Sequence, residues 1–234
     1  MIAVNIVGFK KSGKTSLVLE LAQTLTAMGV RVGAAKSTHN PKLDKENTDT
    51  DRLLAVTVGV AAVTPGEAAV FWPHKRYLAD LLPLLDADVA LVEGGKEYGW
   101  LPRVLLAGNA AEAEELDPGK LALASFGPYV PPGLARPGTI RELAELIMDK
   151  AFALPGLDCG GCGHDDCAGL AARIVAGSAT IADCASLAGK CRVAIDGKPL
   201  PLNPFVERML ARGVRAMLAE LKGYAPGVIE MKME

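Results

Sequence analysis

Residues 8–15 have the sequence GFKKSGKT and follow directly on the apolar run IAVNIV at residues 2–7. They match the pattern G-x-x-x-x-G-K-[ST], and a short apolar run of this kind is typical of a buried strand. The glycines let backbone N–H groups turn inward around phosphate oxygens, and the start of the following helix adds its dipole. The pattern therefore predicts a phosphate-binding loop between a strand and a helix.

The loop motif assigns roles to particular side chains. Lys14 is expected to contact the β- and γ-phosphates of a nucleotide, and the Thr15 hydroxyl is expected to coordinate Mg²⁺. Such a site also needs an acid at the end of a neighbouring strand, and Glu93 directly follows the apolar run VALV. Asp88 lies at the start of that run, which is the wrong end for ligands in a parallel sheet. Lys14 and Glu93 are therefore the predicted catalytic residues.

Strands alternate with helices along the first two thirds of the chain. Strands are expected at 2–7, 31–36, 61–64, 68–72 and 88–92 and within RVLLAG and LALASF, and helices at 15–28, 49–58, 76–85 and 139–152. Apolar strands that alternate with helices predict a mostly parallel sheet covered on both faces. The polar segment STHNPKLDKENTDTD is too long for a simple turn and is predicted to form a loop.

Three of the five cysteines lie in DCGGCGHDDC at residues 158–167. The thiols at the spacing C-x2-C-x4-C-x16-C are Cys159, Cys162, Cys167 and Cys184. Three thiolates on a glycine-rich loop, with a fourth from beyond a helix, can ligate an iron–sulfur cluster. Structural zinc also takes four cysteines, but usually as two close pairs, and no second C-x2-C follows. The spacing favours a cluster over zinc. Cys184 is preferred to Cys191 as the fourth ligand, because Cys191 lies at the edge of the next strand.

The segment after the cysteines has its own pattern. VAIDGKPLPL predicts two strands around an Asp-Gly turn, and Asn203-Pro204 predicts the start of a helix. The alternating tail predicts a final strand that pairs with the hairpin. The predicted domains are 1–152 for nucleotide binding, 153–192 for the iron–sulfur cluster and 193–234 for a hairpin, a helix and a strand. The predicted fold class is α/β, a P-loop NTPase with a small C-terminal iron–sulfur domain and an α+β tail.

Composition limits the partners and the compartment. The chain has 25 basic and 27 acidic residues, a net charge of −2, which predicts no broad attraction to nucleic acid or to an anionic membrane. No apolar run approaches the roughly 18 residues of a membrane span, and no basic region precedes the first apolar run as in a signal peptide. A cytoplasmic protein with reduced thiols is therefore expected.

Four segments, GFKKSGKTSL, VGAAKSTH, TDTDRLLAVTVGV and ADVALVEGGK, together resemble the molybdopterin-guanine dinucleotide biosynthesis adapter family, MobB. This resemblance covers slightly more than half of the chain. It implies a homodimeric GTP-binding protein that uses Mg²⁺ and assists attachment of a nucleotide to molybdopterin. The implied partner is molybdopterin or its nucleotidyltransferase. Because the chain has no Asn-Lys-x-Asp stretch for guanine, the residues themselves leave ATP open beside GTP.

The loop and the resemblance together give the predicted nucleotide-binding residues. These are Gly8, Lys10, Lys11, Ser12, Gly13, Lys14, Thr15, Ser16, Lys36, His39, Glu93 and Gly94. In one respect the sequence departs from the family, because it lacks the histidine often found beside the lysine at position 36.

Residues 154–184 resemble the small four-cysteine [4Fe–4S] domain of electron-transfer subunits and anaerobic methyl-transfer proteins. That resemblance implies Cys159, Cys162, Cys167 and Cys184 as ligands and leaves Cys191 spare. The favoured function is a GTP-binding accessory protein of molybdenum or tungsten pterin cofactor biosynthesis that carries a [4Fe–4S] cluster and hydrolyses nucleotide slowly. The alternatives are a nucleotide-driven electron-transfer or metallocluster-maturation protein, and a binding module without turnover.

Overall fold

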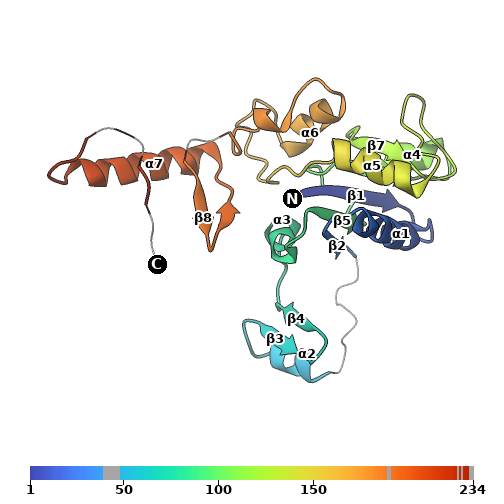
Figure 1. Cartoon of the computed structure of the whole chain (residues 1–234), viewed down its shortest axis with the longest axis horizontal. Coiled ribbons are helices and arrows are strands. Elements are labelled where there is room, and N and C mark those ends of the chain that lie inside the picture. The colour runs from blue at the N-terminus through green and yellow to red at the C-terminus, as the bar shows by residue number, and fades with distance from the viewer. Residues whose placement is uncertain (39–47, 189–190, 226, 228, 232–234) are drawn as a thin grey trace. The chain divides into compact units, whose positions relative to one another are not determined.

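The computed structural model describes residues 1–38, 48–188, 191–225, 227 and 229–231 (Figure 1). The chain forms two compact units, Met1–Gly156 and Leu157–Glu234. None of the helices in the described residues is long and apolar enough to cross a membrane.

A five-stranded sheet in the order β2-β5-β1-β6-β7 forms the centre of the first unit. Its strands are β1 (Ile2–Gly8), β2 (Val32–Lys36), β5 (Val89–Glu93), β6 (Arg103–Leu106) and β7 (Ala122–Ser125). Every pairing among them is parallel, which confirms the predicted parallel sheet. In the register, Ile6 of β1 and Lys36 of β2 both lie opposite Glu93 of β5. The carboxyl ends of these three strands therefore meet at one edge.

Helices cover both faces of this sheet. Successive side chains of a strand point to opposite faces, so β1 contributes to two cores. Val4 and Ile6 pack with helices α1 (Lys14–Ala27) and α5 (Ile140–Lys150). Ala3 packs with residues of α3 (Leu78–Leu81) and the 3₁₀ helix η1 (Leu82–Leu85), and Val7 packs with α4 (Ala110–Leu116). Burial on both faces explains why the strands are continuous apolar runs.

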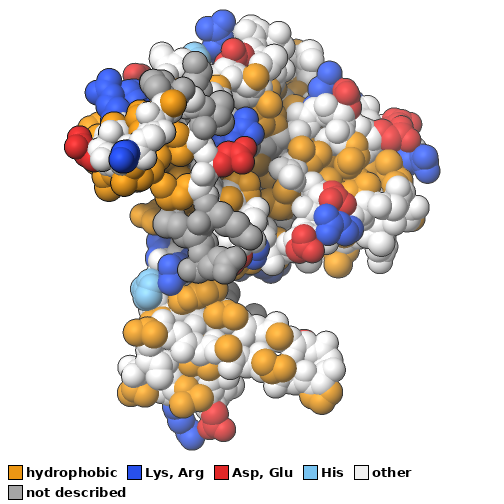
Figure 2. Space-filling model, turned by 60° about the vertical axis from the view of Figure 1, so that its left-hand side comes forward, with side chains coloured by type: hydrophobic (Ala, Val, Ile, Leu, Met, Phe, Trp, Pro, Cys, Tyr) orange, Lys and Arg blue, Asp and Glu red, His pale blue; other side chains and the backbone are white. Residues whose placement is uncertain are grey.

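The strands β3 (Val60–Val63) and β4 (Ala68–Phe71) form a separate antiparallel hairpin that follows helix α2 (Asp49–Leu54). The apolar patterns at residues 61–64 and 68–72 predicted both strands but did not distinguish them from the parallel sheet. Their surface carries apolar side chains, as Figure 2 shows. Val56, Val58 and Val63 are 82%, 88% and 79% exposed. An apolar surface of this kind is typical of a contact region rather than of a free surface.

The second unit contains α6 (Cys167–Val175), the 3₁₀ helix η2 (Ile181–Asp183), the hairpin of β8 (Val193–Ile195) and β9 (Lys198–Leu200), and α7 (Pro204–Ala219). The predicted cap is present, because the Asn203 side chain accepts hydrogen bonds from the N–H groups of Phe205 and Val206. The expected tail strand does not form in residues 229–231, and 232–234 lie outside the described residues. Pro199 in β9 has no N–H group, which leaves this strand a poorer partner for a third strand.

Candidate functional site

The loop between β1 and α1 needs its glycines for reasons of space and backbone conformation. A Cβ atom at Gly8 would collide with the Ser12 Oγ and lie 3.0 Å from the Leu106 carbonyl oxygen. Gly13 has a φ of 89°, in the left-handed region that glycine adopts without strain. The glycines of the motif therefore set the path of the backbone that turns into α1.

Lys14 lies at the first position of α1, and its side chain turns back to the loop. Its Nζ donates hydrogen bonds to the carbonyl oxygens of Gly8 at 2.9 Å and Phe9 at 2.7 Å. Burial lowers the pKa of the Lys14 ammonium, while the Glu93 carboxylate raises it and Lys36 lowers it. The ammonium is thus held against the backbone of the loop that is expected to surround phosphate.

Glu93 brings together residues from three separate segments. The Thr15 Oγ1 donates a hydrogen bond of 2.9 Å to Glu93 Oε1, and the Lys36 Nζ lies 3.9 Å from the same oxygen. The Glu93 side chain is only 14% exposed. A hydroxyl beside a carboxylate supplies the hard oxygen donors that Mg²⁺ prefers. The geometry therefore suits the metal position that the sequence assigned to Thr15 and Glu93.

A cavity of about 390 Å³ opens at this edge of the sheet. It is lined by Lys10, Lys11, Ser12, Gly13, Lys14, Thr15, Ser16 and Glu93. Three lysines against one glutamate favour an anionic ligand. Of the other predicted residues, Lys36 contacts Glu93 and Gly94 directly follows it, whereas His39 lies outside the described residues. At Gly94, φ is 78° and a Cβ would lie 2.7 Å from the Ser37 carbonyl oxygen, so only glycine fits.

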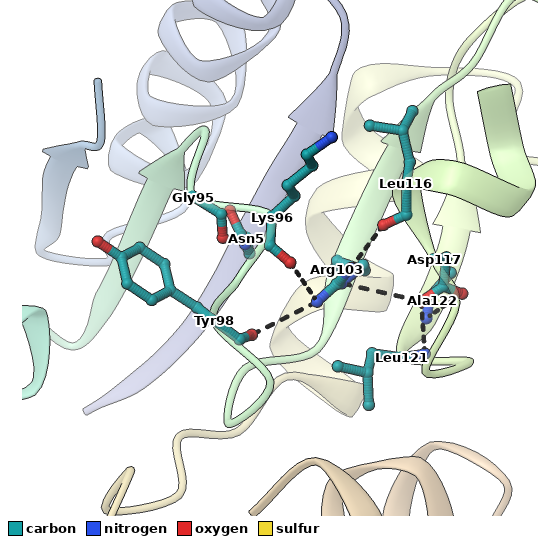
Figure 3. Close-up of polar contacts among 9 residues, drawn as sticks. All are labelled: Asn5, Gly95, Lys96, Tyr98, Arg103, Leu116, Asp117, Leu121 and Ala122. Carbon is teal, nitrogen blue, oxygen red and sulfur yellow. Dashed lines mark hydrogen bonds and ion pairs between the residues drawn. The ribbon is translucent and has the colours of Figure 1, made fainter. Parts of the chain in front are cut away.

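Two buried polar side chains that were not predicted lie beside the segment that follows Glu93. Figure 3 shows the side chains of Asn5 and Arg103 directed toward the backbone of that segment. Lys96, in the same segment, has its Nζ 5.8 Å from the centroid of the Phe9 ring in the phosphate loop. Asn5 within the apolar run IAVNIV was the one available signal, because a buried polar side chain needs a hydrogen-bond partner.

The four cysteines predicted as ligands lie in the second unit. Cys159 is exposed and Cys162 is half-buried, whereas Cys167 and Cys184 are buried. The cysteine loop lies close to the residue after Cys184, since a Cβ at Gly161 would be 3.2 Å from the Ala185 Cβ. Within the described residues, however, no three or more His, Cys, Asp or Glu side chains gather closely enough to hold a metal ion.

Neighbouring acids have structural roles in this loop. The Asp158 Oδ1 accepts a hydrogen bond from the Cys167 N–H, and the Asp166 side chain caps α6 by accepting from the Gly169 N–H. Burial raises the pKa of the Cys167 thiol to about 11. Metal ligation requires the thiolate, so a bound metal would have to displace this proton. The donor types fit an iron–sulfur cluster, and the loop is partly ordered by its own side chains.

The fold and the loop define the class of this protein. A parallel sheet with the G-x-x-x-x-G-K-[ST] loop after its central strand is the fold of a P-loop NTPase. The family described as "Molybdopterin guanine dinucleotide synthesis protein B", MobB, matches residues 3–125. The chain belongs to the MobB family. A second family, described as "Putative Fe-S cluster", matches residues 154–186.

Individual relatives agree with this assignment. A "Putative molybdopterin-guanine dinucleotide biosynthesis adapter protein" of Methanocaldococcus jannaschii is 26% identical over 231 residues, which cover 95% of this chain and 93% of the relative. A "Probable molybdopterin-guanine dinucleotide biosynthesis adapter protein" of Bacillus subtilis is 28% identical over 120 residues, covering 48% of this chain and 69% of the relative. The crystal structure of Bacillus subtilis MobB superposes with a TM-score of 0.51 at 19% identity, covering 62% of this chain and 98% of that chain. That likeness shows the shared fold.

Proposed function

We propose that this protein binds GTP with Mg²⁺ as an accessory protein of molybdopterin guanine dinucleotide biosynthesis, and that it carries a [4Fe–4S] cluster. The observation that carries the proposal is the contact between Thr15 and Glu93 at the lysine-lined cavity of a MobB-family fold. ATP is the alternative nucleotide, because no described residue identifies the base.

Each residue of the nucleotide site has a proposed role. The backbone from Gly8 to Ser16 surrounds the phosphates, Lys14 neutralises the β- and γ-phosphates, and Lys10 and Lys11 add positive charge at the cavity wall. Thr15 and Glu93 hold Mg²⁺, which neutralises phosphate charge when bound. Lys36, at the end of β2, and His39 are proposed to complete the site.

The cluster is proposed to be held by the thiolates of Cys159, Cys162, Cys167 and Cys184. Support comes from the match of residues 154–186 to an iron–sulfur family and from the burial of two of these thiols. A [4Fe–4S] cluster supplies one-electron transfer when it is bound. The chain itself orders the loop through the hydrogen bonds of Asp158 and Asp166.

The partners follow from the relatives, two of which are named as biosynthesis adapters. We propose molybdopterin or its nucleotidyltransferase as the partner, and a homodimer as the assembled form. The exposed valines around α2 and the β3–β4 hairpin support a contact with a second copy, since such a surface is costly to leave in water.

A single anaerobic preparation of the full chain tests this proposal. We expect tighter binding of GTP than of ATP, a requirement for Mg²⁺, a mass twice that of one chain by light scattering, and about four irons with matching sulfide per chain. Titration calorimetry and iron, sulfide and zinc analysis measure these quantities. Protein that binds no nucleotide contradicts the first half of the proposal, and one zinc without sulfide contradicts the second.

Hydrolysis by the isolated protein is expected to be slow. Phosphoryl transfer depends on positioning and on positive charge at the γ-phosphate, and no arginine lines the cavity within the described residues. We expect a turnover number well below the roughly 1–100 s⁻¹ of dedicated phosphoryl-transfer enzymes, raised by a partner protein. Steady-state phosphate release with GTP and with ATP measures it. Fast turnover by the protein alone would favour the nucleotide-driven electron-transfer alternative.

A further inference from the structure

The connection between β5 and β6 has an unusual path. These strands lie on either side of β1 and are parallel, so the chain must cross the sheet face from the end of β5 to the start of β6. A parallel crossover usually contains a helix, which satisfies its own backbone groups. Residues 94–102, here called the crossover segment, contain turns and bends but no helix. Its buried carbonyl groups therefore need hydrogen-bond donors from elsewhere.

Two buried side chains on adjacent strands supply those donors. Asn5 and Arg103 lie opposite each other in the register of β1 and β6, and they are 0% and 2% exposed. The Asn5 Nδ2 donates to the Gly95 carbonyl at 2.8 Å. The Arg103 Nη2 donates to the carbonyls of Lys96 at 3.3 Å and Tyr98 at 3.5 Å (Figure 3). Together they hold three carbonyls of the crossover segment.

The remaining contacts of Arg103 extend to α4. Its Nη1 donates to the Leu116 carbonyl at 2.5 Å, and its Nε lies 3.8 Å from Asp117 Oδ1 without a hydrogen bond. The Asp117 carboxylate accepts instead from the N–H groups of Leu121 and Ala122, at 2.7 and 3.1 Å. The guanidinium is therefore directed at backbone carbonyls more than at its counter-ion. A buried charge placed this way joins the crossover segment to the end of α4.

The crossover segment begins at the candidate nucleotide site and contacts it again further on. It starts directly after Glu93, whose carboxylate accepts from Thr15. Lys96 lies beside the Phe9 ring of the phosphate loop, and its Nζ donates to Glu115 Oε1 at 2.8 Å. The Tyr98 hydroxyl donates to the Ser37 Oγ at 3.3 Å, just past the end of β2. A shift of this backbone would therefore move the surroundings of Glu93 directly, whereas it would reach the phosphate loop through the longer contact between Lys96 and the Phe9 ring, at 5.8 Å.

We propose that Arg103 is a positioning residue for the γ-phosphate and Mg²⁺ end of the nucleotide site, acting through the carbonyls of Lys96 and Tyr98. This inference rests on the proposed nucleotide function. Binding of a diphosphate depends on the phosphate loop and Lys14, which Arg103 does not contact. The preference for a triphosphate over a diphosphate depends also on Glu93 and on the backbone that follows it. The two affinities should therefore respond differently to a change at Arg103.

The test is Arg103→Met in the full chain, which keeps an unbranched side chain that can stay buried and removes the guanidinium with its donors. With Mg²⁺ present, the ratio of GTP to GDP affinity should fall about tenfold, a loss of roughly 1.4 kcal/mol, while the GDP affinity changes less than about twofold. Titration calorimetry with both nucleotides measures the ratio, and thermal unfolding measures the stability of each variant. A purely structural role would lower both affinities together.

Ser125→Ala is the matched control. The buried Ser125 donates its hydroxyl to the Tyr129 carbonyl at 2.7 Å and lies 3.4 Å from the Leu105 carbonyl, and neither carbonyl belongs to the crossover segment. This substitution should leave the ratio unchanged. If Arg103→Met does not fold, Arg103→Lys is the variant to measure. A lysine ammonium cannot reproduce the planar arrangement of guanidinium donors, so the ratio of GTP to GDP affinity should fall by a smaller factor. An unchanged ratio in a folded Arg103 variant, or an equal loss for GTP and GDP, overturns the inference. A wild-type protein that binds neither nucleotide overturns the proposed function and, with it, this inference.

Discussion

Lys14→Ala is expected to abolish measurable triphosphate binding while leaving the iron content of the protein unchanged. The Lys14 ammonium lies at the cavity and donates to the loop carbonyls of Gly8 and Phe9. With nucleotide bound it would neutralise two phosphates, and hydrogen bonds to charged groups contribute about 1.5–3 kcal/mol each. Each 1.4 kcal/mol is a factor of about ten, so the affinity should fall on the order of 100-fold or more.

Calorimetric titration with GTP, together with iron analysis of the same sample, checks this expectation. Lys150→Ala is a matched control, because Lys150 is an exposed lysine at the end of α5 and does not line the cavity. Retention of wild-type affinity by Lys14→Ala would rule out a phosphate-binding role for the Lys14 ammonium. Loss of iron together with nucleotide would mean that the two units depend on each other for folding.

The parallel sheet and the geometry of the phosphate loop could be predicted from the sequence because both depend on local patterns. Apolar strands buried on both faces follow from the alternation of strands and helices. The backbone of the loop follows from glycines at positions where a Cβ would collide or φ is positive. The pairing of Glu93 with Thr15 was also predictable, since carboxyl ends of parallel strands meet at one edge.

The crossover segment could not be predicted, because its conformation depends on contacts between distant residues. Gly95 is held by Asn5, 90 positions earlier in the chain, and Lys96 by Arg103 on the next strand. No local pattern distinguishes an arginine that pairs with carbonyls from one on the surface. Helix α4 was not predicted, although it carries a local signal. That signal is Asn109, whose side chain caps the helix by accepting a hydrogen bond from the Glu112 N–H.

Hairpins and tails show the same division between local and distant causes. The β8–β9 turn was predicted from the dipeptide Asp196-Gly197. In the structure both residues have the positive φ that this type of turn requires. That β3 and β4 form a sheet of their own, rather than joining the parallel one, depends on pairing that no local pattern specifies. The cysteine spacing predicts the donors in the same way, whereas their placement around a cluster depends on contacts between the cysteine loop and residues further along the chain.

Cys184→Ser is expected to lose the cluster, whereas Cys191→Ser is expected to keep it. Cys184 is buried at the end of η2, and the following Ala185 lies against Gly161 of the cysteine loop. Cys191 is half-buried near the start of β8, and its N–H donates to Glu207 Oε1 at 3.1 Å. Gly161 also lies against Pro204 at the start of α7, so the feature that favours Cys184 as the fourth ligand is the greater burial of its side chain.

Serine is nearly the size of cysteine but replaces a soft thiolate with a hard oxygen, so the two variants test ligation with little change in packing. We expect about four irons per chain in the anaerobically purified wild type and in Cys191→Ser, and markedly fewer in Cys184→Ser. Iron and sulfide analysis, with the visible absorption spectrum, measures this difference. The reverse result, with iron kept by Cys184→Ser and lost by Cys191→Ser, would assign the fourth ligand to Cys191. Full clusters in both variants would mean that neither thiol is required, and that a fourth ligand must be sought elsewhere.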